Sequence, residues 1–449
     1  MEFFKYNNKS SSNIIYINAR IVDPETELDI KSGFLITDCD KILHFSEGQP
    51  DDLSEFDDCI DCKGNLLIPG LIDVHVHFRD PGDTNKEDII TGTKAAAAGG
   101  VTTVVCQPNT VPTISTVDVL NYVLNKGKQE GYVKVESYAS VTRDGNGLTD
   151  MQSLYDEGAV GFTDDGLPVM NPFLMQQAFK YSAILDVPIA QHAEDLYLSN
   201  KGCINYGYAS NKLNVFGIPE SAESTMISRD IILLEEYNKF AIQDQYNARY
   251  HVLHISSVSG VENVILARKK GLNVTCEVTP HHLLLNDSFF FDKKNYISIG
   301  KVNPPIRNEE TRMFLVESLK NNDIDIIASD HAPHDCHSKK QTLDQAPFGM
   351  IGLETMLPLM LSFYHNNIIG IFDLLKKMTI NPAKLIKSDA GRISIGAPAD
   401  LVLIDLNSEY IIDSRYMVSK SKNTPFQNRK VKGKILFTIV DGNMVFYNM

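Results

Sequence analysis

Short apolar runs separated by polar turns occupy both ends of the chain. They lie at residues 14–17, 33–36 and 41–44 near the N-terminus and at residues 399–404 and 435–442 near the C-terminus. Runs of this length between turn signals predict β-strands, and the last one ends in an Asp-Gly pair that favours a hairpin turn. We therefore expect the two termini to assemble one small β domain.

The middle of the chain alternates between two patterns. Eight apolar runs are typical of buried strands, at residues 71–77, 101–106, 133–141, 159–163, 187–192, 251–255, 273–278 and 324–329. Segments with helical periodicity lie between most of them, at residues 88–98, 117–128, 172–183, 222–237 and 260–270. Strands and helical crossovers in this number predict an α/β fold of the (β/α)8 barrel type.

The two patterns divide the chain into a TIM-like barrel and a terminal β domain. We expect the catalytic (β/α)8 barrel over residues 66–389 and a small β-sandwich formed jointly by residues 1–65 and 390–449. Barrels of this kind carry their active sites at the C-terminal ends of the strands. Polar residues at those ends are therefore the first candidates for chemistry.

A His-x-His pair, His75 and His77, stands at the end of the first predicted strand. Because successive strand residues point to opposite faces, the two imidazoles share one face and can bind the same metal ion. The ends of later strands add further candidate ligands: Asp164, Asp165, His192, His254 and Asp330. Four histidines and up to three carboxylates at one rim are enough for two divalent ions, which polarise a carbonyl and activate water.

Composition and charge exclude several classes of protein. Of the 449 residues, 43% are hydrophobic and 22% charged, which is typical of a globular chain and not of a disordered one. A net charge of −15 argues against nucleic acid or an anionic membrane as the main partner. The seven cysteines are scattered, no apolar run is long enough to span a membrane, and the first residues lack a secretory pattern. We expect a cytoplasmic location.

The sequence around the His-x-His pair resembles a known superfamily. Residues 66–77, Leu-Leu-Ile-Pro-Gly-Leu-Ile-Asp-Val-His-Val-His, resemble the opening of the amidohydrolases, and the next residues, Phe-Arg-Asp-Pro-Gly, resemble dihydroorotases. Similar motifs follow at residues 107–110, 162–166, 277–282, 303–307, 329–334, 346–349 and 423–426. The His-x-His pair is common to the superfamily, whereas the combination of Arg79, Asn109, Asn303 and His334 is much more specific to dihydroorotases.

The resemblance implies zinc-dependent, reversible hydrolysis of dihydroorotate to N-carbamoyl-L-aspartate in pyrimidine synthesis. It implies two zinc ions per subunit, with His75 and His77 on the more buried ion and His192 and His254 on the other. It also implies that Asp330 binds the first zinc and acts as the general acid and base. The residues that the resemblance assigns to the substrate are His77, Arg79, Asn109, Asn303, His334, Phe348 and Gly349.

Arg79 and the fourth strand end each leave an alternative open. The guanidinium of Arg79 can pair bidentately with a substrate carboxylate, or it can form a structural ion pair. At the fourth strand end, many relatives carry a carboxylated lysine that bridges the metals, whereas this chain has Asp164 and Asp165. Adjacent strand residues face opposite ways, so one aspartate enters the barrel, and the resemblance to dihydroorotases with an aspartate there favours Asp165.

Two other functions compete with a dihydroorotase. Another cyclic amidase, such as a hydantoinase, dihydropyrimidinase or allantoinase, is disfavoured by Arg79 and by the missing lysine. A catalytically silent, dihydroorotase-like scaffold of aspartate carbamoyltransferase is disfavoured because such relatives typically lose metal ligands. For assembly, we expect a homodimer, with a complex with aspartate carbamoyltransferase as a further form.

Overall fold

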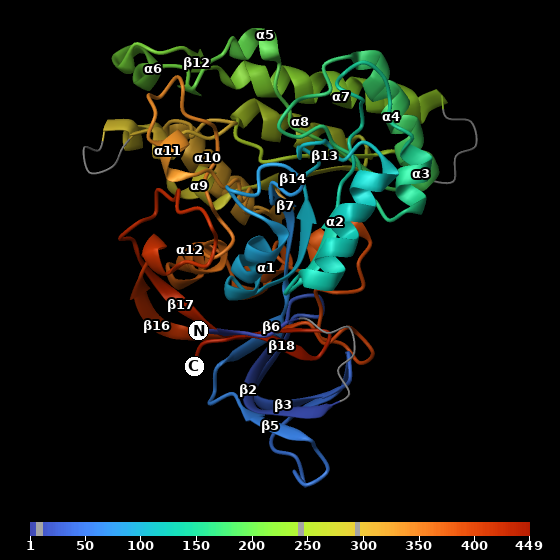
Figure 1. Cartoon of the computed structure of the whole chain (residues 1–449), viewed down its shortest axis with the longest axis vertical. Helices are drawn as coiled ribbons and strands as arrows, with labels where there is room; N and C mark the ends of the chain where they lie inside the picture. The colour runs from blue at the N-terminus through green and yellow to red at the C-terminus, as the bar shows by residue number, and fades with distance from the viewer. Residues whose placement is uncertain (6–11, 241–246, 292–296) are drawn as a thin grey trace.

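The computed structural model describes residues 1–5, 12–240, 247–291 and 297–449. Strands from both termini form one nine-stranded sheet, in which β5 (Asp58–Asp61) pairs with β2 beside the main path. The main path runs in the order β1 (Glu2–Phe3), β18 (Asn443–Tyr447), β17 (Lys430–Val440), β16 (Leu401–Ile411), β6 (Leu66–Pro69), β2 (Asn13–Asp23), β3 (Leu28–Asp38) and β4 (Lys41–Glu47). Because β1 pairs with β18, the two chain ends lie side by side (Figure 1).

Side chains from both halves of this sheet pack into a single apolar cluster. Tyr16 and Leu35 come from the N-terminal strands, Leu403 and Phe437 come from the C-terminal strands, and Leu67 comes from β6 between them. A sheet whose two halves share a core is curled over itself, as in a β-sandwich. The predicted fold class, a barrel with a β-sandwich made by the termini, is confirmed.

The middle of the chain forms the parallel barrel. One run of strands is β7 (Leu71–Val76), β8 (Val101–Cys106) and β9 (Lys134–Ser137), and the other is β10 (Pro188–Gln191), β13 (Arg249–Val252), β14 (Val274–Val278) and β15 (Ile326–Ile327). Phe162 bridges the two runs through Ala139 and Ile189, and His331 closes the circle by pairing with Val76.

The fourth predicted strand, at residues 159–163, is reduced to the bridge at Phe162. Its neighbour Pro188 has no N–H to donate, so the contact with β10 consists of Phe162 N–H to the Pro188 carbonyl and Ala190 N–H to the Phe162 carbonyl. A turn at Asp164–Leu167 follows at once. The short strand therefore delivers Asp164 and Asp165 directly to the barrel rim.

Helices cover the outside of the barrel, and the helices expected from periodicity are present. The longer ones are α1 (Ile89–Ala98), α2 (Val117–Glu130), α4 (Pro172–Leu185), α7 (Glu220–Phe240), α8 (Val258–Lys269), α10 (Glu309–Lys320) and α12 (Met356–His365). The shorter ones are α3 (Met151–Asp156), α5 (Leu196–Ser199), α6 (Tyr208–Leu213), α9 (Pro280–Leu284), α11 (Cys336–Lys339), α13 (Ile371–Lys376), α14 (Ile380–Ile386), and the 3₁₀ helices η1 (Asp287–Phe291), η2 (Ile297–Gly300) and η3 (Ser414–Tyr416). Between α5 and α7, β11 (Ile204–Asn205) pairs with β12 (Gly217–Ile218).

Helix starts follow the sequence signals. Asp88 caps α1 by accepting the Thr91 N–H, and Asn171 caps α4, which has Pro172 in its first turn.

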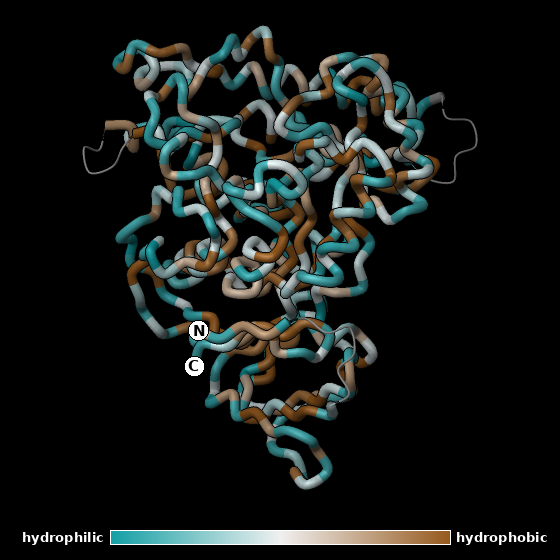
Figure 2. Tube along the Cα trace, in the orientation of Figure 1, coloured by the Kyte–Doolittle hydropathy of each residue, from teal (hydrophilic) through white to brown (hydrophobic). Residues whose placement is uncertain are grey.

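Apolar stretches run through the centre of the barrel and of the terminal sheet (Figure 2). In the described part of the chain, no helix combines the length and apolarity that crossing a bilayer requires.

Candidate active site

His75 and His77 leave the end of β7 with their rings 5.2 Å apart, and both side chains are buried. The backbone N–H of His77 donates to the His331 carbonyl at 2.8 Å, which fixes the end of β7 against the segment that carries Asp330. The Asp330 Oδ1 atom lies 3.1 Å from His77 Nε2 and 3.6 Å from His75 Nε2. The first and the eighth strand ends therefore meet in one cluster.

Asp165 lies between two histidine pairs. Its Oδ2 atom is 3.4 Å from the Nε2 atoms of both His75 and His77. Its Oδ1 atom is 3.4 Å from His192 Nδ1 and 3.4 Å from His254 Nε2. The result is two triads that share one carboxylate, which is the arrangement of a binuclear metal site bridged by Asp165.

Asp164 faces away from this cluster. Its carboxylate accepts the backbone N–H of Thr142 at 2.9 Å and also the Thr142 hydroxyl. It holds the loop after β9 and has no part in either triad. Of the two aspartates that the sequence offers, Asp165 is the one that enters the barrel.

The hydrogen-bond pattern of the histidines fits a pair of cations. The Nδ1–H of His75 donates to Glu277 Oε1 at 2.6 Å, and the Nδ1–H of His77 donates to Asn109 Oδ1 at 2.9 Å. Both rings then turn the Nε2 lone pair toward carboxylate oxygens, and His75 Nε2 and Asp165 Oδ1 are buried without a hydrogen-bond partner. Lone pairs converge here, and a divalent ion with imidazole and carboxylate ligands satisfies them.

Two buried acids support the cluster from behind. Glu277 holds His75 through one oxygen and the Nε2–H of His251 at 3.2 Å through the other. Glu194 accepts the Nε2–H of His192 at 3.1 Å. Such partners fix the ring that faces a metal and raise its basicity. The sequence analysis assigns a role to neither acid. Glu277 could have been noticed, because an acid within a largely apolar buried strand requires a partner.

Burial and the neighbouring histidines have opposite effects on the pKa values of the two carboxylates in the cluster. Burial alone raises the pKa of Asp165, but the neighbouring histidines, His75 first among them, hold that pKa well below its usual range. The same competition between burial and histidines, here led by His77, lowers the pKa of Asp330. Both carboxylates are therefore ionised at neutral pH.

Three residues of the site have left-handed backbone conformations that non-glycine residues rarely adopt. They are Arg79, His254 and Asp330, with φ values of +60°, +33° and +45°. Such residues persist only where the surroundings hold them, and they gather at functional sites. The backbone at this rim is therefore held in place to present these side chains.

A cavity of about 330 Å³ opens onto the cluster. Its lining includes every residue that the sequence assigns to the substrate: His77, Arg79, Asn109, Asn303, His334, Phe348 and Gly349. A cavity of this volume is sufficient for a small cyclic molecule. The predicted ligands Asp165, His192, His254 and Asp330 line the same cavity.

Arg79 is half-buried and makes no ion pair with any residue that the structure describes, and its Nε atom is buried without a hydrogen-bond partner. Burial lowers its pKa, but an arginine remains charged. The structural ion pair that the sequence left open is therefore absent from residues 1–5, 12–240, 247–291 and 297–449. The guanidinium is available to an anion inside the cavity.

Two polar groups that line the same cavity as Arg79 have fixed orientations. The Nε2–H of His334 donates to the Phe348 carbonyl at 2.7 Å, and burial lowers the pKa of this histidine, so the ring is neutral with a free Nδ1. The Nδ2 amide of Asn303 donates to Glu194 Oε2 at 2.8 Å. Each group thus keeps an acceptor atom for a ligand.

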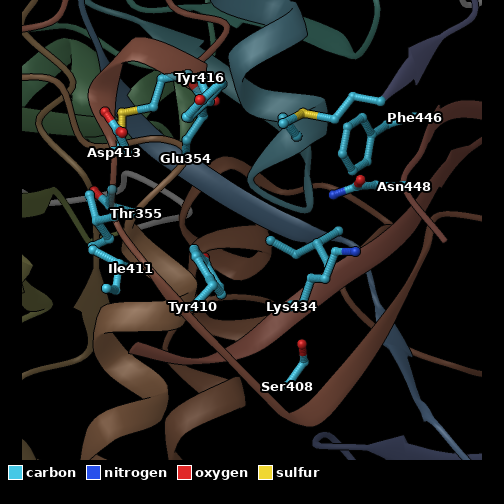
Figure 3. Close-up of a pocket in the computed structure, with 15 residues that line it drawn as sticks. Glu354, Thr355, Ser408, Tyr410, Ile411, Asp413, Tyr416, Lys434, Phe446 and Asn448 are labelled. Carbon is cyan, nitrogen blue, oxygen red and sulfur yellow. The ribbon is translucent and has the colours of Figure 1, made fainter. Parts of the chain in front are cut away.

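A second cavity, of about 470 Å³, lies apart from these residues (Figure 3). Strands β16, β17 and β18 supply much of its lining, including Tyr410, Ile411 and Phe446. None of the predicted site residues lines it. The larger cavity is not where the metal-binding groups gather.

A (β/α)8 barrel with two histidine–carboxylate triads at its C-terminal rim defines a metal-dependent hydrolase. Residues 64–259 match the family model described as "Dihydro-orotase-like". The dihydroorotase of Ehrlichia canis (strain Jake) is 51% identical over 96% of this chain and 95% of its own, and that of Aquifex aeolicus (strain VF5) is 39% identical over 96% and 99%. The chain belongs to the dihydroorotase family of metal-dependent cyclic amidohydrolases, as its motifs predict.

Two solved structures that resemble this chain are named as a hydantoinase and a dihydropyrimidinase. The L-hydantoinase (dihydropyrimidinase) of Arthrobacter aurescens superimposes with a TM-score of 0.85 over 97% of this chain and 96% of its own, at 26% identity. The dihydropyrimidinase of Brevibacillus agri NCHU1002 gives a TM-score of 0.84 over 97% and 95%, at 21% identity. These similarities establish the shared barrel and terminal sheet.

Proposed function

We propose that this enzyme hydrolyses (S)-dihydroorotate reversibly to N-carbamoyl-L-aspartate with two zinc ions per subunit. The observation that carries the proposal is the half-buried Arg79, which has no ion-pair partner among the described residues and lines the same small cavity as the two triads. Dihydroorotate is a cyclic amide with a carboxylate, so its recognition requires a cation beside the amide-cleaving site. The arrangement supports this substrate over an uncharged hydantoin or dihydropyrimidine.

The six proposed metal ligands divide between the two ions. His75, His77 and Asp330 would hold the first, His192 and His254 would hold the second, and Asp165, which both triads share, would serve both. Zinc bound in this way lowers the pKa of water and polarises the amide carbonyl. Imidazole and carboxylate ligands suit zinc, and metal content measured on the purified protein tests that identity.

The cavity residues orient the substrate. The guanidinium of Arg79 pairs with the carboxylate in a bidentate manner. Because Asn109 Oδ1 already accepts from His77, its Nδ2 amide is left to donate to the same carboxylate. Asn303 Oδ1 and His334 Nδ1 remain as acceptors for ring N–H groups, and the backbone around Phe348 and Gly349 closes the pocket.

Asp330 moves the proton. Its carboxylate is ionised at neutral pH, because the neighbouring histidines outweigh the effect of burial on its pKa. It can therefore accept a proton from the attacking water and deliver it to the ring nitrogen as the amide bond breaks. In the reverse direction the same group takes a proton from the attacking nitrogen and gives it to the departing hydroxide, which leaves as water.

Turnover of L-dihydroorotate by the purified, zinc-loaded protein tests the proposal, with the loss of ultraviolet absorbance as the readout. We expect hydrolysis of dihydroorotate and little or none of dihydrouracil or hydantoin. Preference for the uncharged rings would instead identify another cyclic amidase. Metal-loaded, folded protein without turnover would favour the silent scaffold, and adding aspartate carbamoyltransferase would separate that from a partner-dependent enzyme.

We also propose the wider setting that goes with this activity. Residues 66–389 act as the catalytic barrel, and residues 1–65 and 390–449 form the supporting domain. A homodimer, association with aspartate carbamoyltransferase and a cytoplasmic location complete the proposal. Sedimentation of the protein with and without the carbamoyltransferase tests the assembly.

A further inference from the structure

The segment at residues 417–426, here called the strap, connects η3 to β17 and reaches from the terminal sheet to the barrel rim. It has no helix or strand of its own. Nevertheless, many of its polar groups bond to the barrel. It contains none of the predicted metal or substrate residues.

Two carboxylates, the half-buried Glu354 and the buried Glu87, hold the first half of the strap. Glu354 accepts the backbone N–H groups of Val418 at 2.9 Å and Ser419 at 3.0 Å. Glu87 accepts the backbone N–H of Lys420 at 3.2 Å and the hydroxyl of Ser419. Together these hydrogen bonds fix the position of the strap at the rim.

Both polar atoms of the Asn423 side chain form hydrogen bonds with two barrel loops. Its Oδ1 atom accepts the backbone N–H of His334 at 3.1 Å, and its Nδ2 amide donates to the carbonyls of Gly349 at 3.2 Å and Ala332 at 3.4 Å. Its backbone carbonyl accepts the Ile351 N–H at 3.0 Å. The side chain is 2% exposed, so these bonds are shielded from water.

These two loops form adjoining walls of the substrate cavity. Ala332 and His334 line it from the loop after β15, and Phe348 and Gly349 line it from the next loop. The walls touch directly, since His334 donates to Phe348 and a Cβ on Gly349 would lie 2.7 Å from the Ala332 carbonyl. Asn423 is bonded to both walls at the point where they meet.

We propose that Asn423 is a positioning residue for substrate binding: it sets the distance between the His334 and Gly349 walls and thereby the shape of the pocket. The inference rests on the proposed function. The hydrogen bonds of Asn423 go to His334, Ala332, Gly349 and Ile351, and not to the proposed metal ligands. Its loss should therefore weaken substrate binding while leaving the zinc in place.

The test compares Asn423→Ala and Asn423→Asp with Ser421→Ala as the matched control. Ser421 lies in the same strap and is 5% exposed, and its hydroxyl donates to the Lys86 carbonyl at 2.6 Å, outside the cavity lining. KM and kcat for dihydroorotate, zinc content and the thermal midpoint are measured for each variant. Asn423→Asp keeps the acceptor for His334 but loses both amide donors.

We expect Asn423→Ala to raise KM about tenfold or more, with a smaller change in kcat and full zinc content. Asn423→Asp, which turns a carboxylate oxygen toward the carbonyls of Ala332 and Gly349, should raise KM at least as much, and Ser421→Ala should lower only the thermal midpoint. A KM within about twofold of wild type in Asn423→Ala, or an equal rise in Ser421→Ala, would overturn the inference. If the alanine variant does not fold, the isosteric aspartate variant decides by the same comparison of KM.

Failure of this inference differs visibly from failure of the proposed function. A wild-type protein that binds zinc but does not turn over dihydroorotate contradicts the function itself, and the positioning role with it. An active wild type whose Asn423 variants keep its KM contradicts the positioning role alone.

Discussion

Asp330 has a place in the site that no other carboxylate shares. Among the described residues it lies within 3.6 Å of the first histidine pair only, whereas Asp165, which also lines the cavity, contacts both histidine pairs. We expect Asp330→Asn to reduce turnover by about a thousandfold or more, because the amide cannot carry the proton. The circular dichroism spectrum should match that of the wild type, and an active variant would contradict the assigned role.

Arg79 decides which cyclic amide the cavity prefers. Without its guanidinium the substrate carboxylate has no cationic partner, so Arg79→Ala should lower kcat/KM for dihydroorotate about a hundredfold or more. Any activity on dihydrouracil, which lacks the carboxylate, should change little. Arg79→Lys is the control, since it keeps the charge and loses the planar fork. An equal loss on both substrates would reject the carboxylate contact.

Glu277 supports the metal cluster from behind, through His75. Because it fixes the ring of His75 from the far side, Glu277→Gln should weaken zinc binding about 10- to 100-fold. Competition with a chromogenic chelator measures this affinity directly. Asp164→Asn is the matched control, since Asp164 holds Thr142 and not a metal ligand. Similar zinc affinity in both variants would contradict the role of Glu277.

At the scale of elements, the sequence predicted what local pattern encodes. Alternation of apolar runs with helical segments predicted the barrel, and His75 and His77 could be placed on one face by their spacing alone. The choice between Asp164 and Asp165 depends on the phase of the fourth strand, that is, on which of its residues face the barrel interior. This strand is reduced to one bridging residue, Phe162. Local pattern does not contain that phase.

The supporting contacts could not be predicted because they join distant parts of the chain. Glu277 lies 202 residues from the histidine that it holds, and Asn423 lies 89 residues from His334. Neither has a spacing signal, since folding alone brings the partners together. The family resemblance identified the substrate residues, but it does not explain why Arg79 has no ion-pair partner among the described residues.

Helix α11 ends at Lys339, which is fully buried and has an unusual environment. Its Nζ atom donates to the carbonyls of Lys301 at 3.1 Å and Pro347 at 3.0 Å, and burial lowers its pKa to about 7. Between pH 7 and 10 the unfolded chain binds this proton and the folded chain does not. The free energy of unfolding should therefore rise with pH over that range.

Lys339→Met isolates this effect. From pH 7 to pH 9 the wild type should gain more than about 1.4 kcal/mol relative to the variant, because one pKa unit corresponds to that amount. Chemical denaturation at the two pH values measures the difference. Lys340→Met, at the exposed neighbour, is the control. Parallel pH profiles of Lys339→Met and the wild type would show that Lys339 folds in its charged form.

At the scale of the whole molecule, the terminal sheet and the barrel are joined closely around the site. Gly70 alone separates β6 of the sheet from β7, the barrel strand that carries His75. The chain packs tightly at this junction, because a Cβ on Gly70 would lie 2.2 Å from the Thr102 hydroxyl. On the other side, the strap returns from the sheet to the cavity wall. The sheet therefore supports both the metal side and the substrate side of the pocket.

Metal removal should destabilise the whole molecule, because the cluster gathers buried charge. Asp165 and Asp330 are ionised, and imidazole lone pairs face them within 3.1 to 3.6 Å. A ligand that binds only the folded state stabilises it by about 4 kcal/mol at a thousand times its Kd. Chelation should therefore lower the thermal midpoint by several degrees, zinc should restore it, and Asp165→Asn, without the shared bridge, should respond much less. A midpoint that is unchanged by chelation, in protein shown by elemental analysis to have lost its zinc, would mean that the folded cluster is stable without the ions.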